Sequence, residues 1–548
     1  MVEVFERSNW TDRMEEVAVE EVARAISGID IGVIAGYFLI VVVIGVWVSR
    51  KTETGEDLFL AGRSLGWGII GFSLFASNIS STTLIGLSGA AYSSGIAVST
   101  YEWMSGVPLL ILAFIFLPLY LRSRITTIPE FLELRYDRRS RRYFSIVTIA
   151  LSIIVDTAGG LYAGAVVLKT FFPDLVIWQV CVALGLFAGV YTAAGGLKAV
   201  VYTDLLQAIV LIFGTTLMTI IMFGQLDYSW ANVVAAVPNE QHLSMIRPMG
   251  DDMLPWPGIL TGVTLLGFWY WVTNQYIVQR VLGAKDLKNA QYGAILGGFL
   301  KIIPLFTMVL PGAMAILLIP ELPNADMVFP TLVTTVLPVG VTGLVLAGLI
   351  AAIMSSVDST LNSASTLVVH DFVLEAKPDT PRDKIGTYGK ITTLILMLVA
   401  IAWAPQIANF GGLWVYLQQA FGIIVPPVAV IFLVGTFWKR GNASGAIWAL
   451  GLGHALGLVV FLLGQAGYWP IHFTINVGIM AVISTIVFVV FSLRSEAPSE
   501  DVVQRMTWSS GVAAEVHAAE GNAASGGGRA IFAGLLVVAM LAVVIGFW

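Results

Sequence analysis

The chain has 548 residues and a formal net charge of −6, and 57 % of its residues are hydrophobic while only 12 % are charged. An average soluble domain carries about 25 % charged residues, so this composition excludes a water-soluble globular protein. The acidic balance argues against a nucleic-acid partner. The 55 glycines and 16 tryptophans favour close helix packing and interfacial anchoring, so we predict an all-α integral membrane protein in contact with the lipid bilayer.

Residues that carry enzymatic chemistry are sparse. The single cysteine, Cys181, lies in an apolar run, and the five histidines show no metal-ligand spacing. The sequence contains no GxxxxGK[ST] phosphate-binding loop and no nucleophile–base constellation. We therefore expect neither enzyme activity nor an ATP-driven step.

Fourteen apolar segments are each long enough, at about 20 residues, to cross a bilayer as a helix. Numbered 1 to 14, they lie near residues 29–49, 66–94, 97–121, 143–172, 175–193, 200–224, 256–279, 289–319, 339–373, 387–404, 410–437, 443–464, 471–493 and 530–548.

Basic residues are distributed unevenly between the connections. Those after odd-numbered helices contain nearly all of them, including the run 135–142 and Arg280, whereas the even-numbered connections contain only Lys169 and Arg247. The positive-inside rule then puts the odd connections in the cytoplasm and both termini outside. This anchoring explains the run 135–142, although a lipid or partner site there stays open. We expect a multi-pass protein of the plasma membrane, the inner membrane of a bacterium.

Helices 2 and 7, five helices apart, both carry polar interruptions near midspan. Two sets of five helices with opposite topology are the inverted-repeat plan of many secondary transporters. We predict an outer N-terminal tail (1–28), an extra first helix (29–49), a first repeat of helices 2–6 (66–224) and a second repeat of helices 7–11 (256–437). Two peripheral helices (443–493), a polar cytoplasmic linker (495–528) and a last helix (530–548) would follow.

The interruption in helix 2 runs from Ser77 to Thr83, where six of seven residues are polar. One interpretation is a Ser/Thr-rich contact between helices. The other is a discontinuous helix whose freed carbonyls coordinate a cation, since irregular backbone at this depth is tolerated only in a cavity or buried in protein.

Helix 9 supplies a complementary polar face. Ser355, Asp358, Ser359 and Asn362 recur at i, i+3, i+4 and i+7, so they share one side of the helix. Hydroxyl and carbonyl oxygens are ligands that hard cations prefer. An intramembrane Asp is costly and needs a partner, for which we expect Asp204 of helix 6. Two carboxylates there favour a second cation or a proton.

Further ionisable groups lie in helices 3, 4 and 8. One interpretation is that Glu102 and Lys301 form a structural ion pair. The other is that they line a polar cavity suited to a hydroxyl-rich neutral solute, together with Ser105, Gln275 and Gln418. Asp156 is expected to be a packed, hydrogen-bonded carboxylate. One or two aromatic residues could stack on a sugar ring or gate the cavity, among Trp269, Tyr270, Trp271 and Trp414.

Five motifs together resemble one family. They are Tyr191-Thr-Ala-Ala-Gly-Gly-Leu-Lys-Ala-Val-Val-Tyr-Thr-Asp-Leu-Leu-Gln207, Thr127-Ile-Pro-Glu-Phe-Leu-Glu-Leu-Arg-Tyr136, Tyr101-Glu-Trp-Met-Ser105, Phe59-Leu-Ala-Gly-Arg-Ser64 and Asn274-Gln-Tyr-Ile-Val-Gln-Arg280. With them, the chain from about residue 30 to 495 resembles the sodium/solute symporters, in particular the sodium/glucose–galactose branch.

The resemblance implies a LeuT-like fold with a five-plus-five inverted repeat and sodium-driven uptake by alternating access. It puts a sodium ion on the carbonyls of Ala76, Ile79 and Ala352 and the hydroxyls of Ser355 and Ser356. A second sodium site, present in some members, matches Asp204, Ser355, Asp358 and Ser359.

For the sugar site, the resemblance points to Asn78, Glu102, Ser105, Lys301 and Gln418, with Tyr270 as the inner gate. The chain also departs from the family pattern: Thr83 replaces a glutamine, Gly267 an asparagine, Leu87 an outer-gate methionine and Trp414 an outer-gate phenylalanine. The loss of two amide contacts leaves the identity of the sugar open, and a related polyol or modified sugar would fit.

Two other functions stay open on the sequence. The first is sodium-coupled uptake of an organic acid, a monocarboxylate or sialic acid, that pairs with Lys301. The second is a membrane sensor or channel without coupling, although the polar tails are too short to resemble a signalling domain.

Overall fold

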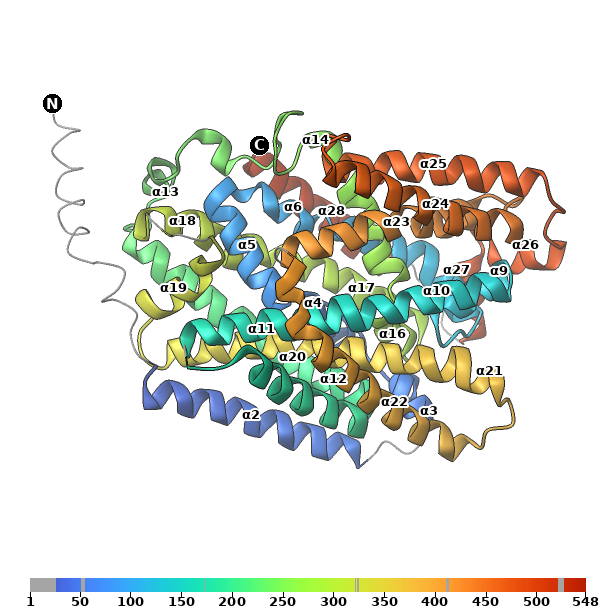
Figure 1. Ribbon diagram of the computed structural model, residues 1–548, viewed down its shortest axis with the longest axis horizontal. Helices are drawn as coiled ribbons and strands as arrows, with labels where there is room; N and C mark the ends of the chain where they lie inside the picture. The colour runs from blue at the N-terminus through green and yellow to red at the C-terminus, as the bar shows by residue number, and fades with distance from the viewer. Residues whose placement is uncertain are drawn as a thin grey trace.

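The computed structural model describes residues 26–50, 55–172, 174–320, 322, 325–410, 413–520 and 527–548, without the side chains of 408–420 and of a few single positions. The described chain is almost entirely helical, and its longest helices run side by side along one direction (Figure 1). Short 3-10 and π turns, labelled η, connect or interrupt the α-helices.

The elements up to residue 225 are α2 (Gly28–Ser49), α3 (Gly55–Leu60), η1 (Ala61–Arg63), α4 (Trp67–Asn78), α5 (Ser81–Ser94), η2 (Ile96–Ser99), α6 (Thr100–Trp103), α7 (Gly106–Ile111), η3 (Leu112–Phe116), α8 (Leu117–Arg122), α9 (Ile128–Arg135), α10 (Arg138–Ala150), η4 (Leu151–Thr157), α11 (Ala158–Phe171) and α12 (Ile177–Gln225).

The elements that follow, up to residue 376, are α13 (Trp230–Ala236), η5 (Glu240–Leu243), α14 (Trp256–Gly258), η6 (Ile259–Val263), α15 (Thr264–Phe268), η7 (Trp269–Thr273), α16 (Gln275–Leu282), α17 (Leu287–Leu300), η8 (Leu305–Val309), α18 (Leu310–Leu318), η9 (Ala325–Met327), α19 (Val328–Thr335), α20 (Val341–Val368), η10 (Val369–Val373) and α21 (Leu374–Ala376).

The remaining elements are α22 (Arg382–Trp403), η11 (Ala404–Phe410), α23 (Leu413–Phe437), α24 (Ala443–Gln465), α25 (Phe473–Leu493), α26 (Glu500–Met506), α27 (Val512–Ala519) and α28 (Gly527–Gly546). The predicted polar linker 495–528 therefore contains two short helices, α26 and α27. Both rest on the protein, because Met506, Val512 and Val516 are buried.

Among the described residues, ten helices are long and apolar enough to cross a membrane, or eleven if the bent pair α4 and α5 counts as one span. Two predicted spans, 175–193 and 200–224, merge in α12. A third, 256–279, is divided among short elements from α14 to α16. The predicted number of fourteen helices is therefore not established by this count.

α12 changes direction at Gly196. Its 49 residues would measure about 74 Å as one straight helix, far more than the ~30 Å hydrocarbon core. Gly196 has φ 58° and ψ −155°, a conformation that residues with a side chain avoid. The single element is thus two helices joined at a glycine.

Two helices are broken near their middle. Between α4 and α5 the backbone leaves the helical conformation at Ile79 (φ −81°, ψ 98°), with a bend of 60°. Between η7 and α16 it does so at Asn274 (φ −76°, ψ 125°). These breaks fall in predicted helices 2 and 7, so at both polar segments the backbone does leave the helical conformation.

α20 lies at the centre of the protein and is buried along nearly its whole length. It packs against α12, α2, α22 and η4, and also against α4 and α5 at the first break. In Figure 1, α2 lies along one side of this core, and α24 and α25 lie together on the opposite side. The polar face of α20 is therefore enclosed by other helices.

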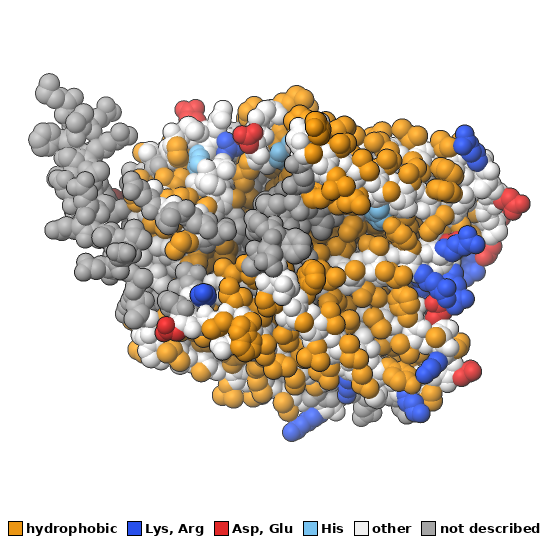
Figure 2. All heavy atoms as spheres, viewed as in Figure 1, with side chains coloured by type: hydrophobic (Ala, Val, Ile, Leu, Met, Phe, Trp, Pro, Cys, Tyr) orange, Lys and Arg blue, Asp and Glu red, His pale blue; other side chains and the backbone are white. Residues whose placement is uncertain are grey.

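The surface is divided by residue type. Figure 2 shows a broad hydrophobic region over the middle of the face in view, while Lys and Arg side chains gather toward the end that carries α9, α21 and α26. Large apolar side chains such as Leu39, Ile209 and Val482 are well exposed. Exposure of this kind on long helices is expected for a surface in contact with lipid.

The extra first helix, α2, is attached to the start of α20 through Asp30. Asp30 Oδ1 accepts hydrogen bonds from the backbone amides of Gly340 and Gly343, both at 2.7 Å. A Cβ at Gly343 would overlap the backbone of Asp30, so glycine permits this approach. Asp30 therefore caps α20 from a different helix and satisfies two amides that the helix itself cannot.

We expect Asp30→Ala to lower the free energy of unfolding by about 1–2 kcal/mol, because the two amides of α20 lose their acceptor. Asp30→Asn, which keeps a side-chain oxygen, should lose less. Thermal unfolding of the purified protein in detergent measures both. Equal losses in the two variants would contradict the capping role.

Candidate functional site

The break between α4 and α5 presents backbone oxygens to the interior. In a continuous helix the amide of Thr83 would bond the carbonyl of Ile79, but it donates to Ser80 Oγ at 3.2 Å instead. The carbonyl of Asn78 accepts from the hydroxyl of Thr83 at 3.2 Å. The predicted ligand Ile79 thus has a carbonyl outside the regular hydrogen-bond pattern, and Ala76 lies one turn before it.

α20 brings the other predicted sodium ligands to this region. The hydroxyl of Ser356 lies 3.1 Å from the carbonyl of Ala352, to which it donates. Ser355 donates to Asp204 Oδ1 at 2.6 Å, which leaves its oxygen lone pairs available. Carbonyl and hydroxyl oxygens on two packed helices, one of them broken, fit a hard cation such as sodium.

Asp204 of α12 is the centre of a second polar cluster. It is fully buried and accepts hydrogen bonds from Ser73 at 2.5 Å, Ser77 at 3.1 Å and Ser355 at 2.6 Å. It also forms an ion pair with Arg280 at 3.1 Å. The carboxylate is therefore bound to α4, α16 and α20 at once.

Asp358 on α20 has different partners from those that the sequence suggested. Its carboxylate accepts hydrogen bonds from the hydroxyls of Tyr191 and of Ser359, the latter at 3.1 Å. The predicted partner, Asp204, is linked to Asp358 indirectly. Ser359 donates to Asp358, Ser77 donates to Asp204, and the hydroxyl oxygens of Ser359 and Ser77 are 3.3 Å apart. The carboxylates thus share a hydroxyl network rather than a direct bond.

Arg280 is the main residue that sequence reasoning misplaced. It was assigned to a cytoplasmic connection, but its side chain is only 1 % exposed and lies inside the cluster. The positive-inside count could not separate it from loop arginines because it ends an apolar segment.

The predicted solute-site residues gather at the other side of the break. Lys301 forms an ion pair with Glu102 and also donates to the side-chain oxygen of Asn78. The lysine side chain is fully buried, and its ammonium lies 5.8 Å from the centre of the Trp271 ring. Of the two interpretations of Glu102 and Lys301, the structure therefore shows the ion pair.

Tyr270 continues this group toward the second break. Its hydroxyl accepts from Tyr276 at 2.6 Å and is also hydrogen-bonded to Asn78. Ser105 donates to the carbonyl of Tyr101 at 3.2 Å, and Leu87 is buried at the first broken helix. The side chains of Gln418 and Trp414 in α23 lie outside the described residues.

Two further predictions were wrong. Gln275 does not contact the group around Lys301, because its side chain accepts from the amide of Ile128 at 2.7 Å and donates to the carbonyl of Thr126 at 3.2 Å. It ties α16 to the start of α9 instead. Asp156 is half-buried on η4, and the described part of the chain gives it no hydrogen-bond partner, although we expected one.

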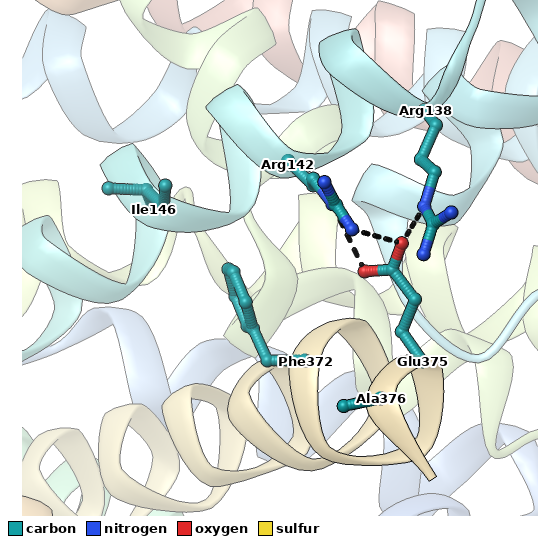
Figure 3. A pocket seen from close by; sticks show the side chains of 6 residues that line it. All are labelled: Arg138, Arg142, Ile146, Phe372, Glu375 and Ala376. Atoms are coloured by element: carbon teal, nitrogen blue, oxygen red, sulfur yellow. Dashed lines mark hydrogen bonds and ion pairs between the residues drawn. The ribbon is translucent and has the colours of Figure 1, made fainter. Parts of the chain in front are cut away.

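The basic run 135–142 is used within the protein. Arg138 and Arg142 both form ion pairs with Glu375, and Figure 3 shows the two guanidinium groups turned toward this carboxylate. They line a surface pocket of about 380 Å³, away from the buried cluster. Arg141 pairs with Asp371 at 2.6 Å. The run therefore joins α10 to η10 and α21.

Comparison with known proteins agrees with this architecture. The sequence profile of the Sodium:solute symporter family matches residues 58–453. The chain is 35 % identical over 538 residues to sodium/myo-inositol cotransporter 2 of Oryctolagus cuniculus, covering 88 % of this chain and 79 % of that protein. It is 33 % identical over 547 residues to sodium/glucose cotransporter 1 of the same species, covering 90 % and 82 %.

Solved structures share the fold at lower identity. A sodium-coupled sialic acid symporter in a substrate-bound outward-open state has a TM-score of 0.77 and 22 % identity, covering 86 % of this chain and 99 % of that chain. A nucleobase-cation-symport-1 family transporter has a TM-score of 0.54 and 16 % identity, covering 83 % and 98 %. The predicted LeuT-like helical fold is confirmed. The chain belongs to the sodium:solute symporter family, whose members are membrane transporters rather than enzymes.

Proposed function

We propose that this symporter imports a neutral polyhydroxy solute, a sugar or a cyclic polyol of the myo-inositol type, together with sodium. The observation that carries the proposal is the pairing of Lys301 with Glu102 and Asn78 beside Tyr270. A neutral group of donors and acceptors suits hydroxyl groups, and the sequence relatives are named for myo-inositol and glucose.

The sodium ion would bind the carbonyls of Ala76, Ile79 and Ala352 and the hydroxyls of Ser355 and Ser356. Its binding would hold the broken helix α4–α5 against α20 and favour the conformation that accepts solute. One charge moving inward through 100 mV contributes about 2.3 kcal/mol. A tenfold sodium gradient adds about 1.4 kcal/mol. Together they support roughly 500-fold accumulation per ion.

The alternative solute, an organic acid, is favoured by the positive charge of Lys301 beside Asn78. That charge is already paired with Glu102, so a carboxylate would have to displace the existing partner. The structural similarity to a sialic acid symporter concerns the fold, at 22 % identity. We therefore rank the neutral solute first.

The experiment is uptake by the purified full-length protein in proteoliposomes, with and without a sodium gradient. Labelled myo-inositol, glucose, galactose, a monocarboxylate and sialic acid form the panel. We expect sodium-dependent accumulation of a neutral member. Accumulation of an acid alone would overturn the solute assignment. Binding of solute without sodium-dependent accumulation would instead favour a sensor or channel.

Ser356→Ala removes one proposed sodium ligand and should raise the sodium concentration for half-maximal uptake about tenfold, since a bond to a charged group contributes roughly 1.5–3 kcal/mol. Ser363, two turns further along α20, has a buried hydroxyl without a partner among the described residues, so Ser363→Ala is the matched control. A sodium dependence unchanged by Ser356→Ala would remove this ligand from the site.

We also propose the plasma membrane as the location, in a bacterium the inner membrane, with both termini outside. The distribution of basic residues among the connections supports this orientation.

For the two inverted repeats, we propose residues 66–224 and 256–437. The breaks at Ile79 and Asn274, each in the first helix of its repeat, support this division.

A further inference from the structure

Arg280 lies where a second cation would bind. The family resemblance suggests Asp204, Ser355, Asp358 and Ser359 as ligands of a second sodium ion. In the structure the Nη2 group of Arg280 donates to Asp204 Oδ2 at 3.1 Å and to the hydroxyl oxygen of Ser359. A positive charge of the protein itself thus contacts two of the four expected ligands.

The guanidinium is held along all its edges. Nε donates to Ser73 Oγ at 2.7 Å, Nη1 donates to the carbonyl of Tyr276, and Nη2 also donates to Ser77 Oγ. Together with the contacts to Asp204 and Ser359, these bonds join α16 to α4, α12 and α20. The planar, permanently charged guanidinium is suited to such a buried position, and each of its three nitrogens donates to an acceptor there.

The contacted oxygens have little capacity left for an ion. Asp204 Oδ2 accepts from Ser73, Ser77 and Arg280, and its Oδ1 accepts from Ser355. A sodium ion needs the lone pairs of these same oxygens, and it would repel a guanidinium at hydrogen-bond distance in a medium of low dielectric. Sodium and Arg280 therefore exclude each other between Asp204 and Ser359.

We propose that Arg280 is the resident cation of this second site, so that the chain binds and transports one sodium ion per solute, at the first site. This inference rests on the proposed sodium-coupled function. Arg280 moves with α16, which begins directly after the break at Asn274. Because its charge stays with the protein, it neutralises Asp204 without adding to the transported charge.

Two readouts on the full-length protein test the assignment: equilibrium binding of radioactive sodium and the charge-to-solute ratio in proteoliposomes. The wild type should bind one sodium ion, with a Hill coefficient near one and one charge per solute. Arg280→Gln should bind a second sodium ion, because it leaves the oxygens of Asp204 and Ser359 free. Its Hill coefficient should rise toward two.

Two further variants separate charge from shape. Arg280→Lys keeps a tethered cation and should still bind one ion. The double variant Arg280→Gln/Asp204→Asn removes both charges and should also bind one, because the vacated site no longer attracts a cation. If Arg280→Gln does not give folded protein, the wild type alone still tests the proposal, because two sodium ions bound to it would overturn it.

Two sodium ions bound to the wild type, or one bound to folded Arg280→Gln, would overturn the role of Arg280. The absence of any sodium-driven uptake by the wild type would instead overturn the proposed function. The two failures are therefore distinguishable in the same preparation.

Discussion

Lys301→Ala is expected to abolish sodium-driven solute uptake and to destabilise the folded protein by about 3–5 kcal/mol. The substitution leaves Glu102, only 6 % exposed, as a buried carboxylate without its ion-pair partner. It also removes the donor to Asn78, which lies at the break of the first helix. Uptake in proteoliposomes and thermal unfolding in detergent measure the two effects.

The control is the double variant Lys301→Met/Glu102→Gln, which removes both charges and keeps similar volumes. Replacing both members of a buried pair is often neutral for stability, so this variant should fold nearly as well as the wild type. Its uptake should stay low, because the polar groups that orient the solute are changed. Normal uptake by the double variant would show that the pair is structural and not part of the solute site.

Gly196→Ala should produce the second large effect, a loss of folding stability well beyond the about 1–3 kcal/mol that a strained backbone conformation costs by itself. Gly196 has φ 58° and ψ −155° at the kink of α12, where a Cβ would overlap the carbonyl oxygen of Leu58. Because backbone atoms cannot move aside as a flexible side chain can, the kink itself must shift. The kink leads directly into the segment with Asp204, so sodium-dependent uptake should fall as well.

Gly68→Ala is the matched control for this prediction. Gly68 lies inside α4, and no described atom is within 4 Å of the position its Cβ would take. Alanine in a helix is more stable than glycine by roughly 1 kcal/mol, so this variant should be unaffected or slightly stabilised. A similar melting temperature for Gly196→Ala and the wild type would exclude a structural need for glycine at the kink.

The candidate site divides between residues that the sequence could locate and residues that it could not. Ser355, Asp358 and Ser359 were placed on one helix face by their spacing, and the structure has this helix at the buried centre. The interruption after Ser77 was recognisable because lipid cannot satisfy so many polar groups. Which oxygens the break frees depends on Ser80 capping α5, and this is a matter of backbone geometry.

Arg280 and Gln275 show where sequence reasoning failed. Both follow the break at Asn274: Gln275 was expected to line a polar cavity, and Arg280 was assigned to the connection after the apolar segment 256–279. Gln275 turns to the start of α9, whereas Arg280 enters the cluster around Asp204. Arg280 lies five residues after Gln275, and five residues of an α-helix turn a side chain by about 140° net, so the two point to different sides and the packing of α16 decides which neighbours each one meets.

By itself, the sequence determined the environment and the class of this protein. A composition rich in apolar residues and poor in charge requires lipid, and the midspan polar residues, costly in lipid, indicated a transporter with broken helices. Only the tertiary structure decided which of the scarce charges neutralise one another: Lys301 with Glu102, and Arg280 with Asp204. These partners lie 199 and 76 residues apart, and electrostatic energy depends on distances in space that no spacing along the chain specifies.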